Sequence, residues 1–164
     1  MLGLSQSVSY AVSALACLGQ EGGNRTFVRN IANCAEVPPA YLAKLFTKLA
    51  AAGLIDSKRG WRGGNQLARP AEEISLFDIA EAIEDLPWLN KCLLGGAECS
   101  DERACPTHGF WSGTRKNIER ELRSRTLADV IAFNTKNDLD GGKVSDAAGT
   151  DTTRETEESR YGVS

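Results

Sequence analysis

The sequence predicts a mainly α-helical chain that carries one small β-hairpin. Apolar residues recur at helical spacing in three short segments before residue 53. A basic, glycine-rich turn then separates two short strand-like segments within residues 54–68, and a long charged helical pattern covers residues 110–125. With 164 residues, 41% of them hydrophobic, the chain is large enough for one compact core.

Three helices are expected in the first 53 residues. Residues 8–19 and 27–36 each place apolar side chains at i, i+3, i+4 and i+7, and Gly22-Gly23 separates the two segments. Pro38-Pro39 cannot continue the second helix but suits the first turn of a third, which runs to about Ala52 and ends at Gly53. One face of this third helix is apolar, and the other presents Tyr41, Lys44, Thr47 and Lys48.

The hairpin follows directly. Residues 54–57 and 65–68 form the two strands, and the turn between them contains Lys58, Arg59 and Arg62 among glycines. A phosphate-binding loop would need the order strand–loop–helix and a Gly-Lys-Ser/Thr ending, whereas this order is strand–loop–strand. A solvated turn remains the plain alternative, but two short helices, a third with a basic face and a basic hairpin together favour a winged helix-turn-helix.

Particular side chains are expected to contact duplex DNA. Arg59 is expected to enter the minor groove and Arg62 to meet the backbone. The remaining candidates contact phosphates or base edges: Tyr41, Lys44, Lys48 and Lys58.

Charge is distributed unevenly along the chain. Residues 1–70 contain eight Lys and Arg against three Asp and Glu, whereas residues 71–164 contain eleven against nineteen, within a total of −3. The pattern indicates a basic N-terminal module on an acidic remainder, although chance clustering is the alternative. No apolar run approaches the roughly 20 residues of a membrane span, and the start lacks the features of a secretory signal, so we expect a cytoplasmic protein without a membrane.

Five cysteines fall into two groups. Cys17 and Cys34 lie in helical apolar patterns, where we expect small buried thiols and no disulfide. The others form Cys92-x6-Cys99-x5-Cys105-x2-His108 in a loop rich in glycine and polar residues. Such a density of thiols favours an iron–sulfur cluster, with His108 as a fourth ligand; structural zinc and a metal-free thiol switch remain open.

The sequence resembles the IscR/NsrR-type iron–sulfur winged-helix regulators of bacteria between residue 4 and about residue 133. Besides the three cysteines, the motifs that carry the resemblance are Tyr10-Ala11-Val12, Tyr41-Leu42-x2-Leu45-Phe46, Ala52-Gly53-Leu54-Ile55, Arg59-Gly60-x2-Gly63-Gly64, Ile74-Ser75-Leu76-x-Asp78-Ile79 and Thr126-Leu127-Ala128-Asp129. Asn65 stands where a tyrosine is common, and Pro38, Pro39, Ala40 and Ala43 replace polar residues, so fewer base contacts are expected.

The resemblance implies a homodimer on a palindromic operator, and we expect the protein to act as a repressor. The sequence contains no Ser-His-acid set and no nucleotide-binding fingerprint, so we do not expect an enzyme. It also implies an iron–sulfur cluster on Cys92, Cys99 and Cys105, of the 2Fe-2S type by preference or 4Fe-4S, which senses iron, redox state or nitric oxide. IscR-like members use a histidine at the place of His108, whereas NsrR-like members use an acidic residue where this chain has Ser9. A cluster-free or zinc-bearing winged-helix module is the alternative.

Five segments are therefore expected. The DNA-binding module covers residues 1–70, a connecting helix residues 71–91, the cluster loop residues 92–108, dimerisation helices residues 109–137 and a disordered acidic tail residues 138–164. The long helix at residues 110–125 is the expected dimer seam, with intramolecular packing as the alternative. The cluster loop is expected to lie between the DNA-reading head and this helix.

Overall fold

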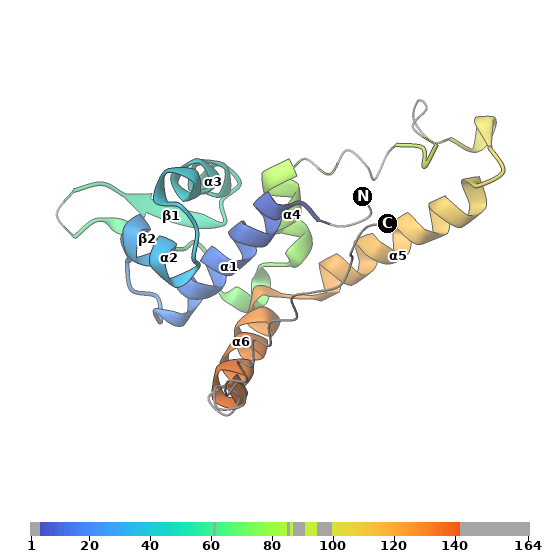
Figure 1. The fold of residues 1–164 in the computed structure, drawn as a ribbon. Helices are drawn as coiled ribbons and strands as arrows, with labels where there is room; N and C mark the ends of the chain where they lie inside the picture. The colour runs from blue at the N-terminus through green and yellow to red at the C-terminus, as the bar shows by residue number, and fades with distance from the viewer. Residues whose placement is uncertain (1–3, 61, 85, 87–90, 95–99, 142–164) are drawn as a thin grey trace, which may run out of the picture.

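The computed structural model describes residues 4–60, 62–84, 86, 91–94 and 100–141 (Figure 1). It confirms a mainly helical winged-helix fold with one two-stranded antiparallel sheet. The elements are α1 (Gln6–Gln20), α2 (Val28–Cys34), α3 (Pro39–Ala51), β1 (Ile55–Lys58), β2 (Gly64–Leu67), η1 (Ala71–Glu73), α4 (Leu76–Glu84), η3 (Asp101–Arg103), α5 (His108–Ser124) and α6 (Leu127–Gly141). None of the described helices combines the length and apolarity that a bilayer crossing requires.

Helix α1 forms the centre of the core. The side chains of Val8, Ala11, Ala14 and Leu15 are fully buried, and α1 contacts α2, α3, α4 and α6. Helix α3 buries the apolar face that its spacing predicts, which comprises Leu42, Leu45, Phe46 and Leu49. Helices α1 and α6 approach closely at Gly19, where an added Cβ would lie 2.5 Å from the end of the Ile131 side chain and would require that side chain to shift.

The turn between α2 and α3 uses a strained residue. Glu36 has a φ of 54°, in the left-handed region that a non-glycine residue rarely adopts. Val37 follows as a buried residue, and its backbone N–H donates to the Ala32 carbonyl at 3.0 Å. Pro39 then begins α3, where the missing proline N–H costs no helical hydrogen bond. The helix-turn-helix is therefore closed by a short, tightly bonded turn.

The hairpin pairs Ile55 with Leu67 and Lys58 with Gly64. At its tip the Gly63 N–H donates to the Gly60 carbonyl at 2.8 Å, and a Cβ at Gly63 would lie 2.7 Å from that same oxygen. Glycine is thus required at position 63 by the close approach of the backbone. We call this hairpin, residues 55–67, the wing.

Reciprocal side-chain caps stand at the starts of α4 and α6. At α4 the Asp78 N–H donates to Ser75 Oγ at 3.1 Å, and the Ser75 N–H donates to Asp78 Oδ2 at 3.2 Å. At α6 the corresponding bonds join Thr126 and Asp129 at 3.3 and 2.8 Å. Ser75 and Thr126 also form an antiparallel bridge, so the starts of the two capped helices are bonded to each other.

Helix α6 is longer than the sequence analysis expects. It continues through Gly141, so residues 138–141 are helical and the predicted start of a disordered tail at residue 138 is wrong. The first half of α6 packs on α1 through residues such as Val130 and Ile131, and the helix continues from this packed part through the polar residues that follow. The rest of that predicted tail, residues 142–164, lies outside the described part of the chain.

Candidate nucleic-acid interface and cysteine loop

Helix α3 exposes a face beside the wing, but one of its predicted contact residues is partly engaged. The Tyr41 hydroxyl lies 2.6 Å from Ser7 Oγ, and its ring meets the Tyr10 ring edge-on at 5.9 Å between centroids. Tyr41 therefore helps to fix the start of α3 on α1 and leaves 36% of its surface exposed. Lys44, one turn further along, is exposed.

Lys48 has a partner within the protein. Its Nζ donates to the Ile83 carbonyl oxygen at 2.6 Å, near the C-terminal end of α4. A cation is favoured at this end of a helix because the last carbonyl groups carry the negative end of the helix dipole. The Lys48 side chain thus connects the end of α3 to the end of α4, although the sequence analysis expects it to contact DNA.

The wing presents its basic residues to solvent. Lys58, Arg59 and Arg62 are all exposed. Arg62 has a φ of 63°, a left-handed conformation that turns the tip over at a non-glycine residue. The described part of the wing therefore carries all three predicted cations on its surface.

A groove of about 680 Å³ lies between the start of α2 and the wing. It is lined by Phe27, Val28, Arg29, Asn30, Ser57, Lys58, Arg59, Gly60, Gly64 and Asn65. Arg29 adds a cation from α2, and Phe27, 58% exposed, adds an aromatic surface beside it. The sequence analysis missed both residues, although Arg29 was one of the eight basic residues in the N-terminal count.

Arg25 is a third residue that sequence reasoning missed. Its guanidinium forms an ion pair with the Asp56 carboxylate and donates to two backbone carbonyls, that of Asp56 at 3.3 Å and that of Gly64 at 3.2 Å. These acceptors lie on both strands of the wing. Arg25 therefore fixes the wing to the segment between α1 and α2.

Asn65 strengthens the same junction. It is 6% exposed, and its backbone exchanges hydrogen bonds of 2.9 and 2.8 Å with Thr26. Ser57 Oγ donates to Asn65 Oδ1 at 2.6 Å, which adds a bond across the wing. Asn65, which stands where a tyrosine is common, is thus a buried hydrogen-bonding residue where the wing meets the segment before α2.

The described part of the cysteine loop brings two thiols together. Hydrogen bonds from Thr107, the largest cause, and from the Cys92 thiol hold the pKa of the Cys105 thiol below its ordinary value of 9.0. The start of the loop is fixed by Trp111, whose buried indole N–H donates to the Lys91 carbonyl at 2.8 Å. Cys99 lies outside the described residues.

His108 is the first residue of α5 and faces an acidic partner. Its Nε2 lies 2.8 Å from Asp101 Oδ1, and its side chain is 14% exposed. Within the described ranges no group of three or more His, Cys, Asp or Glu side chains is arranged to hold a metal ion. Two thiols and a carboxylate-paired histidine nevertheless suit a metal site, because ligating histidines commonly bond a carboxylate through the other ring nitrogen.

The sequence analysis expects the cysteine loop to lie between the DNA-reading head and the long helix, but the structure does not place it there. Helix α5 projects away from the body, and its first residues lie at the opposite end of the molecule from the wing (Figure 1). A 17-residue helix spans about 25 Å. The cysteine loop is thus separated from the wing of its own chain by the length of α5.

The expectation for Cys17 and Cys34 is also wrong. The structure joins them in a disulfide, and Cys34 is exposed instead of buried. Sequence periodicity places both residues on helices, but it does not give the distance between those helices. Packing of α2 on α1 brings the two Cα atoms to 6.2 Å, within the usual range for a disulfide.

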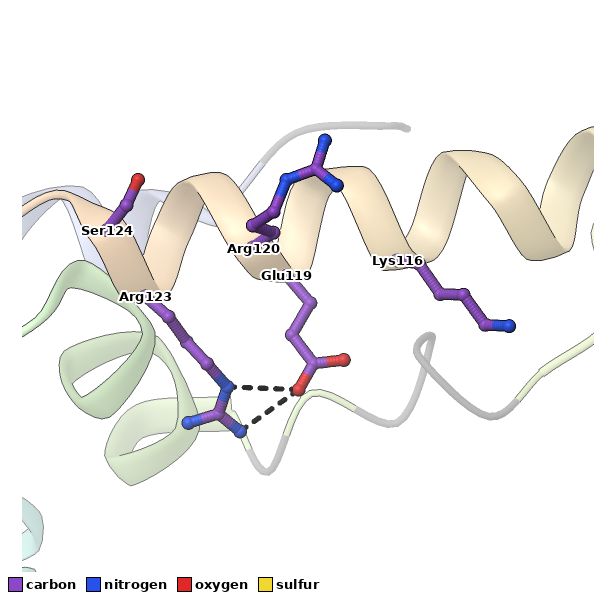
Figure 2. Close-up of a pocket in the computed structure, with 5 residues that line it drawn as sticks. All are labelled: Lys116, Glu119, Arg120, Arg123 and Ser124. Carbon is purple, nitrogen blue, oxygen red and sulfur yellow. Dashed lines mark hydrogen bonds and ion pairs between the residues drawn. The ribbon is translucent and has the colours of Figure 1, made fainter.

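Helix α5 is held to α4 at one end. Arg123 lies over the Phe77 ring at 3.6 Å from its centroid and also bonds Glu119 at 3.0 Å (Figure 2). A hollow of about 490 Å³ lies on this face. Figure 2 shows the residues that line it, which are Lys116, Glu119, Arg120, Arg123 and Ser124. Trp111 is the single buried residue that α5 contributes among those described.

The helix-turn-helix and the basic wing define a winged-helix DNA-binding regulator. The chain belongs to the Rrf2 family, whose model, described as Iron-dependent Transcriptional regulator, matches residues 4–132. Members of this family are transcriptional regulators and not enzymes.

Known relatives agree in sequence and in structure. The HTH-type transcriptional regulator IscR of Cereibacter sphaeroides is 33% identical over 135 residues, which cover 78% of this chain and 86% of the relative. The solved structure of IscR from T. potens has a TM-score of 0.63 at 29% identity and covers 91% of this chain and 94% of that one. The structure of CymR, the global cysteine regulator of B. subtilis, has a TM-score of 0.68 at 25% identity, with coverages of 81% and 98%.

Proposed function

We propose that this protein is a homodimeric repressor of transcription whose affinity for a palindromic DNA operator is controlled by an iron–sulfur cluster. The observation that carries the DNA part is the cationic surface that runs from Arg29 on α2 to Arg59 on the wing, beside the exposed face of α3. The cluster part rests on the adjacent Cys92 and Cys105 thiols and on the family.

On the DNA, α3 enters the major groove and supplies Lys44 and part of Tyr41 for contacts with phosphates or base edges. Arg59 enters the neighbouring minor groove, and Lys58 and Arg62 neutralise phosphates. Arg29, on α2, also neutralises a phosphate. Lys48 contributes through its bond to Ile83 as well as through its charge.

A homodimer is supported by the exposure of α5. Apart from the end that contacts α4, this long helix has few partners in its own chain, with only Trp111 buried among its described residues. A second copy packed along α5 would cover Phe110, which is 69% exposed. A two-fold axis there would present two α3 helices to successive major grooves, about 34 Å apart.

For the cluster, Cys92, Cys99 and Cys105 are the proposed thiolate ligands and His108 the fourth ligand. Thiolates are the normal ligands of iron–sulfur clusters, and a histidine in place of one cysteine raises the reduction potential. Asp101 would fix the orientation of the His108 ring. When bound, the cluster supplies a redox-active group, 2Fe-2S by preference, whose gain or loss changes the conformation of this loop.

A continuous set of contacts connects the start of α5 to the reading head. Trp111 holds the loop to α5, and Arg123 packs on Phe77 of α4 at the other end of α5. The end of α4 then holds Lys48 of α3. A coupling of about 1–3 kcal/mol along this path would change operator affinity roughly 5–150-fold, which is enough to regulate a promoter.

DNA binding is tested with a duplex selected from a random-sequence library and measured by fluorescence anisotropy at several salt concentrations. Arg59→Ala should weaken binding and lower the slope of log affinity against log salt by about one, because one phosphate-neutralising cation is lost. Lys136→Ala, on exposed α6, is the control and should match the wild type. Equal affinity of Arg59→Ala and wild type would remove the wing from the interface.

The cluster is tested by anaerobic purification, visible absorption and chemical analysis for iron, sulfide and zinc. Cys92→Ala should abolish the colour, whereas Cys17→Ser should retain it because Cys17 is far from the loop in sequence and lies on α1. Colourless wild-type protein that contains zinc without sulfide would establish the zinc-bearing alternative. In vitro transcription from a promoter that overlaps the operator tests repression.

A further inference from the structure

The disulfide between Cys17 and Cys34 has no role in the function proposed above. Cys17 lies in the last turn of α1, and Cys34 is the final residue of α2. Cys34, one of the two bonded residues, therefore lies two residues before Glu36, where the chain turns from α2 into α3. A covalent bond at this point acts directly on the helix-turn-helix.

Helix α2 is weakly held without it. It has only seven residues, buries only Ile31 and Ala32 and has no side-chain cap at its start. Helices this short are unstable on their own, so their position depends on what they are attached to. Few apolar contacts are therefore available to fix the direction of α2.

The two ends of α2 are attached differently. Before its start, Thr26 exchanges two backbone hydrogen bonds with Asn65 of the wing. At its end, the disulfide attaches Cys34 to α1. Cleavage of the disulfide would remove the covalent attachment at the end of α2 and leave that end held only by the packing of Ile31 and Ala32 and by the turn into α3. Helix α2 carries Arg29 into the groove beside the wing.

The bond is accessible to reagents. Cys34 is exposed and Cys17 is half-buried. Thiol–disulfide exchange needs a thiolate to approach one sulfur directly, and the exposed Cys34 sulfur meets this need. Cys17 then leaves as the thiolate.

We propose that Cys17 and Cys34 form a reversible redox site that sets the order of α2, separate from the cysteines of the loop. The reductant is a dithiol. One of its thiolates attacks Cys34 Sγ, the S–S bond breaks and Cys17 takes up a proton; the second thiol of the reductant then displaces Cys34. Two electrons and two protons pass to the protein, and the dithiol becomes a disulfide.

The expected effect rests on the proposed DNA-binding function. The oxidised protein holds α2, and hence Arg29, in position before binding, whereas the reduced protein must order α2 as it binds. Preorganisation of this kind strengthens binding. We expect the oxidised form to bind the selected duplex roughly 5–10-fold more tightly than the reduced form.

The site itself is tested without DNA. The full chain is equilibrated in buffers of reduced and oxidised dithiothreitol, alkylated, and mapped by mass spectrometry of its peptides. Cys17 and Cys34 should become alkylated together as the buffer becomes reducing. Hydrogen exchange at Ile31 of α2 and at Ala35, whose N–H bonds the Ile31 carbonyl, should become roughly tenfold faster. Free thiols at both positions under oxidising conditions, or unchanged exchange in α2, would overturn the proposal.

DNA affinity is then measured in the same buffers, with the Cys17→Ser/Cys34→Ser double variant as the matched control. This variant keeps the loop cysteines, so any response of a cluster to the reductant persists in it. Wild type should lose affinity on reduction beyond the change in the double variant. Equal responses would overturn this regulation while leaving DNA binding intact, whereas a failure of both proteins to bind any duplex would instead refute the proposed function.

Discussion

Lys48 Nζ on α3 and the Ile83 carbonyl oxygen on α4 are 2.6 Å apart, which joins the DNA-reading helix to the helix that leads to the cysteine loop. The contact lies near the C-terminal ends of both helices. Because it uses a backbone carbonyl, any shift of the end of α4 changes the environment of Lys48. Lys48 is therefore a direct polar connection between α3 and α4.

Replacing Lys48 with Gln should therefore reduce the effect of the cluster on operator affinity more than it reduces the operator affinity itself. We expect a loss of about 0.3–1 kcal/mol in the free energy of unfolding, because a cation is removed from a helix C-terminus. The ratio of operator affinities between cluster-loaded and cluster-free protein should fall toward one. Denaturant unfolding and anisotropy measure the two effects. Lys44→Gln is the control: it should weaken DNA binding while preserving both stability and the affinity ratio.

Arg25 should affect DNA binding without contacting DNA. Arg25→Met removes the ion pair with Asp56 and the bonds to both strands of the wing, so the wing loses its fixed position. We expect affinity to fall about 3–10-fold with an unchanged salt slope, whereas Arg59→Ala lowers the slope. Arg25→Lys keeps the charge but cannot reproduce the forked geometry, so partial loss is expected. A lowered slope in Arg25→Met would show that Arg25 meets phosphate itself.

His108 and Asp101 should stabilise the bound cluster. His108→Ala should speed loss of visible absorbance in air, because a ligand is removed. Asp101→Asn should have the same effect to a smaller degree, because it alters only the partner of the His108 ring. Absorption spectra and decay rates identical to wild type in both variants would exclude His108 as the fourth ligand.

The cap of α6 should make stability depend on pH. Hydrogen bonds from the backbone and side chain of Thr126, with a smaller contribution from Arg125, hold the pKa of Asp129 below its ordinary value of 3.8. A lowered pKa in the folded state means that the carboxylate stabilises the fold above pH 3.8, and that this contribution disappears as pH falls through the folded value.

Asp129→Asn should consequently lower the melting temperature at pH 7 and differ little from wild type well below pH 3.8. Thr126→Val removes both the hydroxyl donor to Asp129 and the acceptor that caps the Asp129 N–H, but keeps the backbone donor. It should therefore be destabilising at every pH and should only weaken the pH dependence. Thermal unfolding by circular dichroism across pH checks both variants. A difference between Asp129→Asn and wild type that stays constant across this range would contradict the assignment.

Local features of the structure were predictable from sequence. The caps at Ser75 and Thr126 depend on residues three positions apart, and the basic wing on glycines and cations within one turn. Such patterns are complete within a few residues, so no knowledge of the packing is needed. The assignments of DNA contacts and cluster ligands remain predictions.

Features that depend on packing were not predictable. The roles of Arg25 and Arg29 arise because the segment between α1 and α2 lies against the wing. The pairing of Cys17 with Cys34 depends on the distance between two helices, and the partner of Lys48 on the place where α4 ends. No spacing rule within a single element contains this information.

Gly64 fixes the spacing between the wing and the segment that precedes α2. With a φ of 129°, it passes so close to Thr26 that a Cβ would lie 3.0 Å from the Thr26 oxygen. The wing and the start of α2 consequently move as one rigid body, and the distance between their cations does not change when a duplex binds. In the binding mode proposed above, the duplex would then have to adapt, and we expect operators with a deformable minor groove to be preferred even at base pairs that no side chain touches.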